Sequence, residues 1–366
     1  MDVSIRAFQQ NFLSIRGAVG EEVRIIPMVK ANAYGLGVGQ AIDALEPMGP
    51  WGYGVAAVEE GLEVRNLGVT KPILVLSPLP PGSYATAVEA GLSVSISDPD
   101  ALTRLKSAAE SAGRPGGFHL EVDTGMGRAG FPWNKADAWV PRVAALFGDP
   151  LRWDGCFTHY HSADAPGDAT RTQWNRLQEV LARLPALPPA AILHACNSPG
   201  ALRRPDLAAD AVRPGIFLYG GVAGEGIPSP HQVASLRARI TLIRDAREGD
   251  TVGYGATHQA QRPERWATVG IGYGDGLPRL LGNRGHALVG GKRVPIIGRI
   301  SMDVTVLDIT GLRDVQVGDV VTFFGEDGGG RIPLEEVASQ AETINYEVLT
   351  DLTPRVPRIW TDDGGY

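Results

Sequence analysis

The sequence predicts a (β/α)8 barrel followed by a smaller, mostly β domain. Eight apolar, strand-like runs alternate with helical stretches in residues 1–221, and short β-branched runs take their place after that. In addition, the chemically distinctive residues of the first part lie at the C-terminal ends of the predicted strands, where α/β folds place their sites. A doubly wound open sheet is the competing fold for the same pattern.

The first domain is predicted element by element from hydrophobic spacing. Ile5, Phe8, Phe12 and Ile15 recur at helical spacing, so the chain opens with an amphipathic helix. The eight strand-like runs are residues 23–29, 51–58, 72–76, 92–96, 118–122, 153–160, 190–195 and 211–219. The helical stretches between them include residues 56–67, 99–112, 135–147 and 170–184.

A change in pattern marks the second domain. The glycine-rich segment 221–228 predicts a linker, so we expect a barrel domain in residues 1–221 and a mainly β domain in residues 222–366. The predicted strands of the second domain are residues 233–243, 267–271, 292–297, 304–309 and 320–324. One helix is predicted at residues 334–340.

Composition indicates a cytoplasmic enzyme. The net charge of −7 argues against a nucleic-acid surface, and no apolar run approaches membrane-spanning length. The two cysteines, Cys156 and Cys196, fit a reducing compartment, and the first residues lack the pattern of a signal peptide. His159 and His161 have no accompanying cluster of acids and cysteines, so we expect no metal site.

The segment 25–37, IIPMVKANAYGLG, carries the strongest chemical signal. A lysine that ends a buried strand can lose its proton more easily and attack a carbonyl group. Tyr34 and the glycines beyond it suit a phosphate held near the start of the next helix. Lys30 with a phosphate cradle is what pyridoxal phosphate requires. An isolated lysine that reaches solvent from a strand end is the alternative.

Further distinctive residues follow the later strands of the predicted barrel. Asp123–Arg128 follows the fifth strand, and His159 ends the sixth. Asn197 and Ser198 follow the seventh, and Arg213 lies in the eighth. We therefore expect these side chains to meet Lys30 at one end of the barrel.

With these residues in view, the chain resembles the alanine racemase family, whose members are fold-type III pyridoxal phosphate enzymes. Eight short motifs occur in the family's order across nearly the whole chain. They are VKANAYG (29–35), DTGMGR (123–128), HACNS (194–198), VRPGI (212–216), GYGAT (253–257), GYGDG (272–276), GRISMDV (298–304) and INYE (344–347).

The resemblance implies a two-base interconversion of L-alanine and D-alanine that supplies D-alanine for peptidoglycan. Lys30 would bind the cofactor covalently and act as the base on one face of the substrate. Tyr254 would be the base on the other face, contributed by the second subunit of a head-to-tail homodimer. Racemisation needs two such groups, because one removes the proton and the other returns it from the opposite side.

The resemblance also implies roles for the surrounding residues. The cofactor-binding set beside Lys30 would be Tyr34, Asn197, Ser198, Gly215, Ile216 and Tyr346, with His159 and Arg213. Arg213 would face the pyridine nitrogen, and His159 would contact both Arg213 and Tyr254. The substrate-binding set would be Arg128, Met302, Asp303 and Tyr273, with Tyr273 at the entrance.

The chain departs from the family at Glu121, where many members carry a carbamylated lysine that positions the arginine equivalent to Arg128. Strand alternation places Glu121 on the same face as His119 and Asp123. We expect Glu121 to supply the anion directly to Arg128. The alternative is that Glu121 forms an ion pair elsewhere in the barrel.

Other functions are less consistent with these residues. A decarboxylase of this architecture would need an acid where the chain has Arg213. A racemase for serine or another amino acid would differ only in the shape of its pocket. A non-catalytic pyridoxal phosphate-binding protein would lack a second domain that carries Tyr254 and Tyr273.

Overall fold

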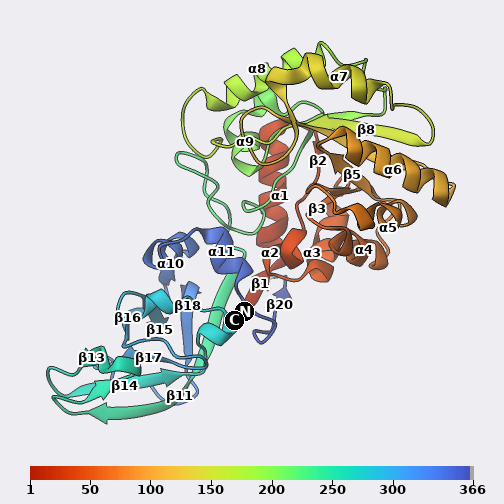
Figure 1. Ribbon diagram of the computed structural model, residues 1–366. Coiled ribbons are helices and arrows are strands. Elements are labelled where there is room, and N and C mark those ends of the chain that lie inside the picture. The colour runs from red at the N-terminus through yellow and green to blue at the C-terminus, as the bar shows by residue number, and fades with distance from the viewer. Residues whose placement is uncertain (363–366) are drawn as a thin grey trace.

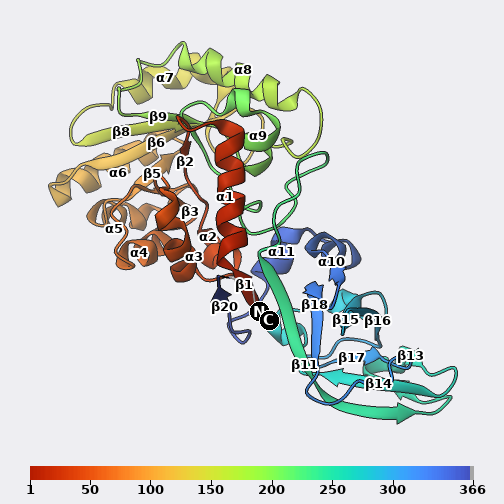
Figure 2. The same ribbon diagram turned by 180° about the vertical axis from the view of Figure 1, so that it is seen from behind.

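The computed structural model describes residues 1–362 and shows two lobes that meet near the first strand of the chain (Figure 1). The first lobe contains the alternating strands and helices, and the second lobe contains most of the antiparallel strands. Helix α1 (Ile5–Val19) leads from the junction of the lobes along the side of the first one (Figure 2). Phe8, Phe12 and Ile15 are fully buried on its inner face, as their spacing predicted.

Eight parallel strands form the sheet of the first lobe. In their order in the sheet they are β2 (Arg24–Ile25), β10 (Ala211–Val212), β9 (Ile192–His194), β8 (Leu151–Phe157), β6 (Gly116–Asp123), β5 (Ser93–Ile96), β4 (Ile73–Val75) and β3 (Tyr53–Val55). The two ends of this sheet meet, because Met28 pairs with Gly54 and the Val29 amide donates to Gly54 O at 2.8 Å. The predicted (β/α)8 barrel is confirmed, and the open-sheet alternative is wrong.

The barrel helices cover the outside of this sheet. They are α3 (Val38–Leu45), α4 (Val58–Asn66), α5 (Tyr84–Glu89), α6 (Pro99–Ala112), α7 (Ala136–Ala144), α8 (Ala169–Leu181) and α9 (Ser198–Arg203). Helix α6 has the bounds that its sequence predicted. Asp98 caps its first turn by accepting a hydrogen bond from the Ala101 amide at 2.8 Å, and Gly113 ends it in the left-handed conformation.

The second lobe is built on a closed antiparallel sheet. Its six strands are β11 (Ala234–Ala246), β14 (Glu264–Val269), β17 (Thr305–Asp308), β16 (Lys292–Ile297), β15 (His286–Val289) and β18 (Val320–Asp327), which returns to pair with β11. Strands β19 (Gly330–Ile332), β1 (Asp2–Ser4) and β20 (Ile359–Thr361) extend it. The first residues of the chain thus pair with the second lobe, through Asp2 opposite Ser235.

Shorter elements complete the structure. Helices α10 (Leu334–Gln340) and α11 (Asn345–Thr350) lie on the side of the second lobe that faces the barrel (Figure 1). The remaining strands are β7 (Phe131–Pro132), β12 (Thr251–Val252) and β13 (His258–Gln259). The short helical turns are α2 (Lys30–Tyr34), η1 (Glu46–Met48), η2 (Pro81–Ser83), η3 (Trp133–Lys135), η4 (Pro205–Leu207), η5 (Tyr254–Ala256), η6 (Tyr273–Asp275) and η7 (Arg279–Leu281).

The eighth barrel strand is much shorter than residues 211–219, so that prediction is wrong. The strand ends at Val212, and Pro214 cannot donate a hydrogen bond to continue the ladder. The chain instead turns, and the Leu218 amide donates to Gly215 O at 2.8 Å. None of the helices in residues 1–362 combines the length and apolar character needed to cross a membrane.

Candidate active site

A cavity of about 530 Å³ lies at the C-terminal ends of the barrel strands. Most of the residues that the sequence singled out line it. They are Lys30, Tyr34, Glu121, Arg128, His159, Asn197, Ser198, Arg213, Gly215, Ile216 and Tyr346. Residues far apart in the sequence meet here because parallel barrel strands all end at the same face.

Lys30 begins a left-handed turn. The residues Ala31 to Tyr34 all have φ between 52° and 54°, which L-residues other than glycine rarely adopt. Two side chains hold the turn: Glu60 Oε1 accepts from the Ala31 amide at 2.7 Å, and Asn32 Oδ1 accepts from the Val38 amide at 2.8 Å. Such a conformation costs about 1–2 kcal/mol per residue, and strain of this kind concentrates at functional sites.

The environment of Lys30 makes its amine easier to deprotonate. Burial lowers its pKa below the ordinary value for lysine, and the positive charge of Arg128 lowers it further, against the opposing effect of Glu60. A neutral amine is the nucleophilic form. The side chain is therefore suited to covalent bond formation with a carbonyl group.

Tyr34 is fixed from both sides. Its ring stacks on Tyr219 with centroids 4.5 Å apart, and Tyr219 Oη donates to Met28 O at 2.8 Å. Burial raises the pKa of Tyr34 above the ordinary value for tyrosine, so the hydroxyl stays protonated and can donate. A Cβ atom on Gly215 would overlap the Tyr34 hydroxyl, so this close approach of side chain and backbone requires glycine.

Hydroxyl groups and backbone amides gather around Gly215. Ser198 Oγ accepts from the Gly215 amide at 2.8 Å, and Asn197 caps α9 by accepting from the Gly200 amide at 3.0 Å. Tyr346, on α11 of the second lobe, reaches the same cavity, and burial raises its pKa to about 12. These donors can together hold an anion such as a phosphate.

Arg213 is a buried cation at the inner wall of the cavity. Its Nη1 donates to His194 Nδ1 at 2.6 Å, and its Nη2 donates to Thr158 O at 2.9 Å. The guanidinium also lies over the Phe157 ring, 5.1 Å from the ring centroid. Burial lowers its pKa to about 10, which keeps it protonated at neutral pH. Arg213 therefore presents donors and a positive charge to any ligand in the cavity.

His159 lies beside Arg213, with 3.3 Å between His159 Nδ1 and Arg213 Nη2. Burial lowers the pKa of His159 to about 3, and the charge of Arg213 contributes to this shift. The imidazole is thus neutral at physiological pH. It can exchange hydrogen bonds in the cavity without adding a second charge there.

Glu121 is bound differently from our expectation. Its Oε2 accepts from Ser95 Oγ at 3.1 Å and from Ser97 Oγ at 3.0 Å, and it forms no ion pair with Arg128 within 4 Å. The expected direct pair with Arg128 is therefore wrong for the described residues, because two nearer hydroxyls occupy this oxygen. Burial raises the pKa of Glu121, while the hydroxyls, Arg213 and Arg128 oppose that shift.

Four predicted site residues do not line the cavity. Tyr254, Tyr273, Met302 and Asp303 all belong to the second lobe. Their side chains are turned to solvent: Tyr254 is 68% exposed, Met302 52% and Tyr273 40%. Asp303 is exposed as well and pairs with Arg355 at 2.8 Å. The fold of one chain does not bring this group to Lys30.

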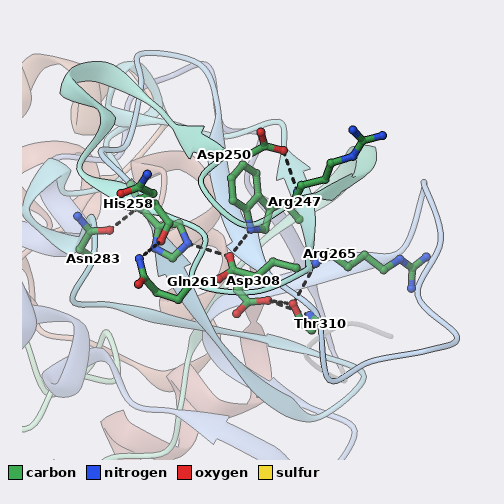
Figure 3. A network of polar contacts seen from close by, with 12 residues as sticks. Arg247, Asp250, His258, Gln261, Arg265, Asn283, Asp308 and Thr310 are labelled. Carbon is green, nitrogen blue, oxygen red and sulfur yellow. Dashed lines mark hydrogen bonds and ion pairs between the residues drawn. The ribbon is translucent and has the colours of Figure 1, made fainter.

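The segment that presents Tyr254 is nevertheless held firmly. Asn283 Oδ1 accepts from the Gly298 amide at 2.6 Å, and Asn283 Nδ2 donates to Thr257 Oγ1 at 3.1 Å. Just beyond, His258 Nε2 lies 2.9 Å from Glu264 Oε2. Figure 3 shows His258 and Asn283 within this polar network of the second lobe. Tyr254 is therefore exposed on a turn whose flanking residues are anchored by hydrogen bonds.

In residues 1–362, no group of three or more histidines, cysteines, aspartates or glutamates is placed to hold a metal ion. The donors of the cavity are instead cations, hydroxyls and amides. They suit an organic anion.

Comparison with known families agrees with this set of donors. The family model for the alanine racemase N-terminal domain matches residues 3–223, and the model for the alanine racemase C-terminal domain matches residues 233–360. The chain belongs to the alanine racemase family. Membership makes it an amino-acid racemase, an isomerase, and confirms the predicted order of the two domains along the chain.

Individual relatives of this racemase are similar over almost the full length. Alanine racemase 2 of Caldanaerobacter subterraneus is 36% identical over 370 residues, covering 98% of this chain and 94% of the relative. The alanine racemase of Bacillus anthracis, solved with bound L-Ala-P, has a TM-score of 0.91 and 31% identity, covering 99% of this chain and 95% of that one. The Bartonella henselae enzyme, with covalently bound pyridoxal phosphate, has a TM-score of 0.89 and 29% identity, covering 98% of each chain.

The cavity of this racemase fits pyridoxal phosphate, the cofactor predicted from its sequence. The space between Gly215 and Tyr34 is too narrow for a Cβ atom. Arg213 provides a buried cation in the same cavity. The cavity volume also falls in the range typical of cofactor sites. Lys30 supplies the amine that a covalent bond needs.

Sequence reasoning missed several residues that support the racemase site. Tyr219 stacks on Tyr34, Glu60 holds the turn after Lys30, and His194 binds Arg213. His194 was within reach of the sequence, because it opens the HACNS motif at the end of a predicted strand. Glu60 was not, since nothing local links it to a turn about thirty residues earlier.

Proposed function

We propose that the protein interconverts L-alanine and D-alanine with pyridoxal phosphate as its cofactor. The observation that carries this proposal is the presence of Lys30 and Arg213 in one cavity with a cradle of hydroxyls and amides. The Bartonella henselae relative carries pyridoxal phosphate covalently, and the Bacillus anthracis relative was solved with L-Ala-P. Similar ligands in this cavity would use the donors already described.

Each part of the cofactor has suitable residues. Lys30 would form the covalent bond, and Arg213 would face the pyridine nitrogen. The phosphate would be held by Tyr34, Ser198, Gly215, Ile216 and Tyr346, with Asn197 fixing the start of α9. When bound, pyridoxal phosphate supplies an electron sink that makes the α-hydrogen of an amino acid acidic.

Arg213 favours racemisation over other reactions of this cofactor. An arginine can only donate hydrogen bonds, so it leaves the ring nitrogen without a proton. This weakens the electron sink and disfavours decarboxylation and transamination. Its contacts with His194 and Thr158 hold the guanidinium in the orientation that this role needs.

The proton would be moved by two bases on opposite faces of the substrate. Lys30 serves one face, and its lowered pKa makes the neutral amine accessible. Tyr254 serves the other face. Because Tyr254 does not line the cavity of its own chain, we propose a head-to-tail homodimer in which each subunit provides Tyr254 to its partner. His159 would contact it there.

The substrate would be held by its carboxylate and limited in size. Arg128 lines the cavity and has no ion-pair partner among the described residues, so its guanidinium is available for a carboxylate. Met302 and Asp303 would complete this clamp from the second subunit, and Tyr273 would narrow the entrance. A narrow entrance favours a small side chain such as the methyl group of alanine over larger ones.

The proposed setting is the cytoplasm, where D-alanine would be supplied for peptidoglycan. Cys156 and Cys196 are both buried and unpaired, which suits a reducing compartment. Burial raises the pKa of both thiols to about 12, so neither is a reactive thiolate.

Hydrogen exchange in heavy water tests the proposal. Purified protein with pyridoxal phosphate is incubated with L-alanine in deuterium oxide, and the products are separated by chirality and weighed by mass spectrometry. D-alanine that carries deuterium at the α-carbon is expected, and Tyr254→Phe is expected to lose most of this activity. L-serine in parallel measures substrate choice. Cofactor binding without exchange on any amino acid would instead indicate a non-catalytic binding protein.

A further inference from the structure

A chain of three hydrogen-bonded side chains runs from the cavity into the barrel core. Arg213 Nη1 donates to His194 Nδ1 at 2.6 Å, and His194 Nε2 lies 2.9 Å from His119 Nδ1. All three side chains are at most 3% exposed. They come from β6, β9 and the residue after β10, so these side chains connect strands on both sides of β8.

Because arginine can only donate hydrogen bonds, Arg213 determines which ring nitrogen of each histidine carries the proton. Because Arg213 can only donate, His194 Nδ1 must be the acceptor, and the proton of the neutral His194 ring is on Nε2. That N–H donates to His119 Nδ1, which places the His119 proton on its own Nε2. Burial lowers the pKa of His119 to about 4 and that of His194 well below the ordinary value for histidine. Both rings are thus neutral.

The structure around His119 is shaped for this contact. A Cβ atom on Gly155 would overlap His119 Nδ1, so only glycine leaves the ring room beside His194. Phe157, two residues further along β8, stacks on His194 with ring centroids 5.0 Å apart. The two histidine rings meet edge to face with centroids 5.0 Å apart. Packing from β8 therefore fixes the planes of the two imidazoles, and the hydrogen bonds determine which edge of each ring faces its partner.

His119, the last residue of this hydrogen-bonded series, borders a second cavity. His119 lines a cavity of about 330 Å³ together with Trp51, Pro72, Ser93 and Asp154, which lie near the N-terminal ends of barrel strands. His119 Nε2 has no hydrogen-bond partner among the described residues. This nitrogen is buried although the ring borders the cavity, so the hydrogen-bonded series ends there among the described residues.

This far cavity is not itself an anion site, because its cations are already engaged. Arg152 pairs with Asp154 at 2.6 Å, and Lys71 pairs with Glu46. Arg65 donates to the backbone carbonyl groups of nearby residues, including Gly91 at 3.2 Å. Among the described residues, the cavity therefore offers no free cation to an anionic ligand.

We propose that His119 is a positioning residue for the racemase reaction, acting on the cofactor through His194 and Arg213. As the acceptor for His194 Nε2–H, it holds the imidazole in the orientation that turns Nδ1 toward Arg213. Without the His119 acceptor, the His194 ring can turn away, and Arg213 loses its anchor. This inference rests on the proposed role of Arg213 toward the pyridine nitrogen.

Nitrogen NMR of protein labelled with ¹⁵N-histidine tests the chain directly. In the wild type, with and without pyridoxal phosphate, His194 and His119 are each expected as a single neutral tautomer protonated on Nε2. Signals from a His194 protonated on Nδ1 would overturn the proposal without any variant. The cofactor-free spectrum tests the chain even if the protein proves to have no racemase activity, so the two proposals fail separately.

Substitutions then test the effect on the site. His119→Leu removes the acceptor, whereas His119→Asn keeps an oxygen near the place of Nδ1. We expect His119→Leu to mix the His194 tautomers, to shift the visible absorption of the bound cofactor, and to lower kcat about fivefold with KM unchanged, the loss of about one hydrogen bond. His119→Asn is expected to restore most of each property.

Leu120→Ala is the matched control, because Leu120 is buried on the same strand but belongs to the opposite face. It should lower stability without moving the His194 signals or the absorption. The proposal is overturned if Leu120→Ala reproduces the effects of His119→Leu, if His119→Asn behaves like His119→Leu, or if His119→Leu changes none of the three properties.

Discussion

Lys30 and Tyr254 lie in different lobes and do not meet within one chain: Lys30 lines the barrel cavity, whereas Tyr254 is 68% exposed on the second lobe. A two-base reaction needs both residues at one substrate. Under the proposed two-base mechanism, a second chain would have to supply the tyrosine. A dimer would then contain two active sites, each built from residues of both subunits.

Mixing two inactive variants should restore activity if the sites are shared. Lys30→Ala and Tyr254→Phe each spoil every site in their own dimer, but a mixed dimer contains one intact site. After subunit exchange, activity is expected to reach about a quarter of the wild-type value, since about half the dimers are mixed and each has one working site of two. The unmixed variants are the controls. Absence of recovery in a mixture shown to exchange subunits would show that Lys30 and Tyr254 do not act together across two subunits.

Glu121 should make the enzyme independent of carbon dioxide. Its carboxylate lines the cavity without any modification, so activity should be equal in bicarbonate-free and bicarbonate-containing buffer. Glu121→Gln removes a negative charge that acts on Arg128 only at a distance, so KM is expected to rise modestly, about two- to threefold. Glu110→Gln on the surface of α6 should have no effect. Activity that bicarbonate restores to a stripped enzyme would contradict this prediction.

The regular parts of the fold followed from the sequence because local and global signals agree there. Helix α6 has an N-cap aspartate, a first-turn proline and a final glycine, and its predicted bounds are correct. Strands β6 and β9 read as buried apolar runs. The ends of the predicted strands at residues 190–195 and 153–160 located Asn197, Ser198 and His159 before any geometry was known.

Other features could not be predicted from local sequence. Alanine and tyrosine disfavour positive φ, and asparagine adopts it mainly as a single residue, so the left-handed turn from Ala31 to Tyr34 depends on distant contacts such as that of Glu60. Residues 213–219 are apolar enough for a strand, yet they turn beneath Tyr34. The short helix α11, which carries Tyr346, has too few residues to show a periodic pattern.

The reactivity of Lys30 should depend on pH and on Arg128. Burial and Arg128 lower the pKa of Lys30, so the neutral amine appears at lower pH than in an ordinary lysine. The rate at which cofactor-free protein captures pyridoxal phosphate should rise with pH, with a midpoint below that ordinary value. Arg128→Gln removes one lowering charge and should move the midpoint upward, while Arg142→Gln on the surface of α7 should not. A downward shift in Arg128→Gln would contradict the electrostatic account.

Gly215 should tolerate no side chain. In Gly215→Ala the new methyl group would overlap the Tyr34 hydroxyl and push it out of the cradle. We expect pyridoxal phosphate to bind at least about tenfold more weakly, as overpacking of a tight site predicts. Gly17→Ala, in helix α1 with no atom near its added Cβ, is the matched control and should bind normally. Equilibrium titration of cofactor fluorescence measures both. Equal affinities of Gly215→Ala and Gly17→Ala for pyridoxal phosphate would show that Gly215 is not part of the phosphate site.

The strain after Lys30 should be measurable as stability. Ala31 is exposed and has φ of 52°, a conformation that costs alanine about 1–2 kcal/mol and costs glycine almost nothing. Glycine also loses about 0.5–1 kcal/mol through the entropy of the unfolded chain, so Ala31→Gly should stabilise the protein by about 0.5 kcal/mol. Ala108→Gly, inside helix α6, should destabilise it by about 1 kcal/mol. Urea midpoints of the two variants give the comparison. If both substitutions destabilise the protein equally, the turn stores no strain, and the contacts of Glu60 and Asn32 alone account for its shape.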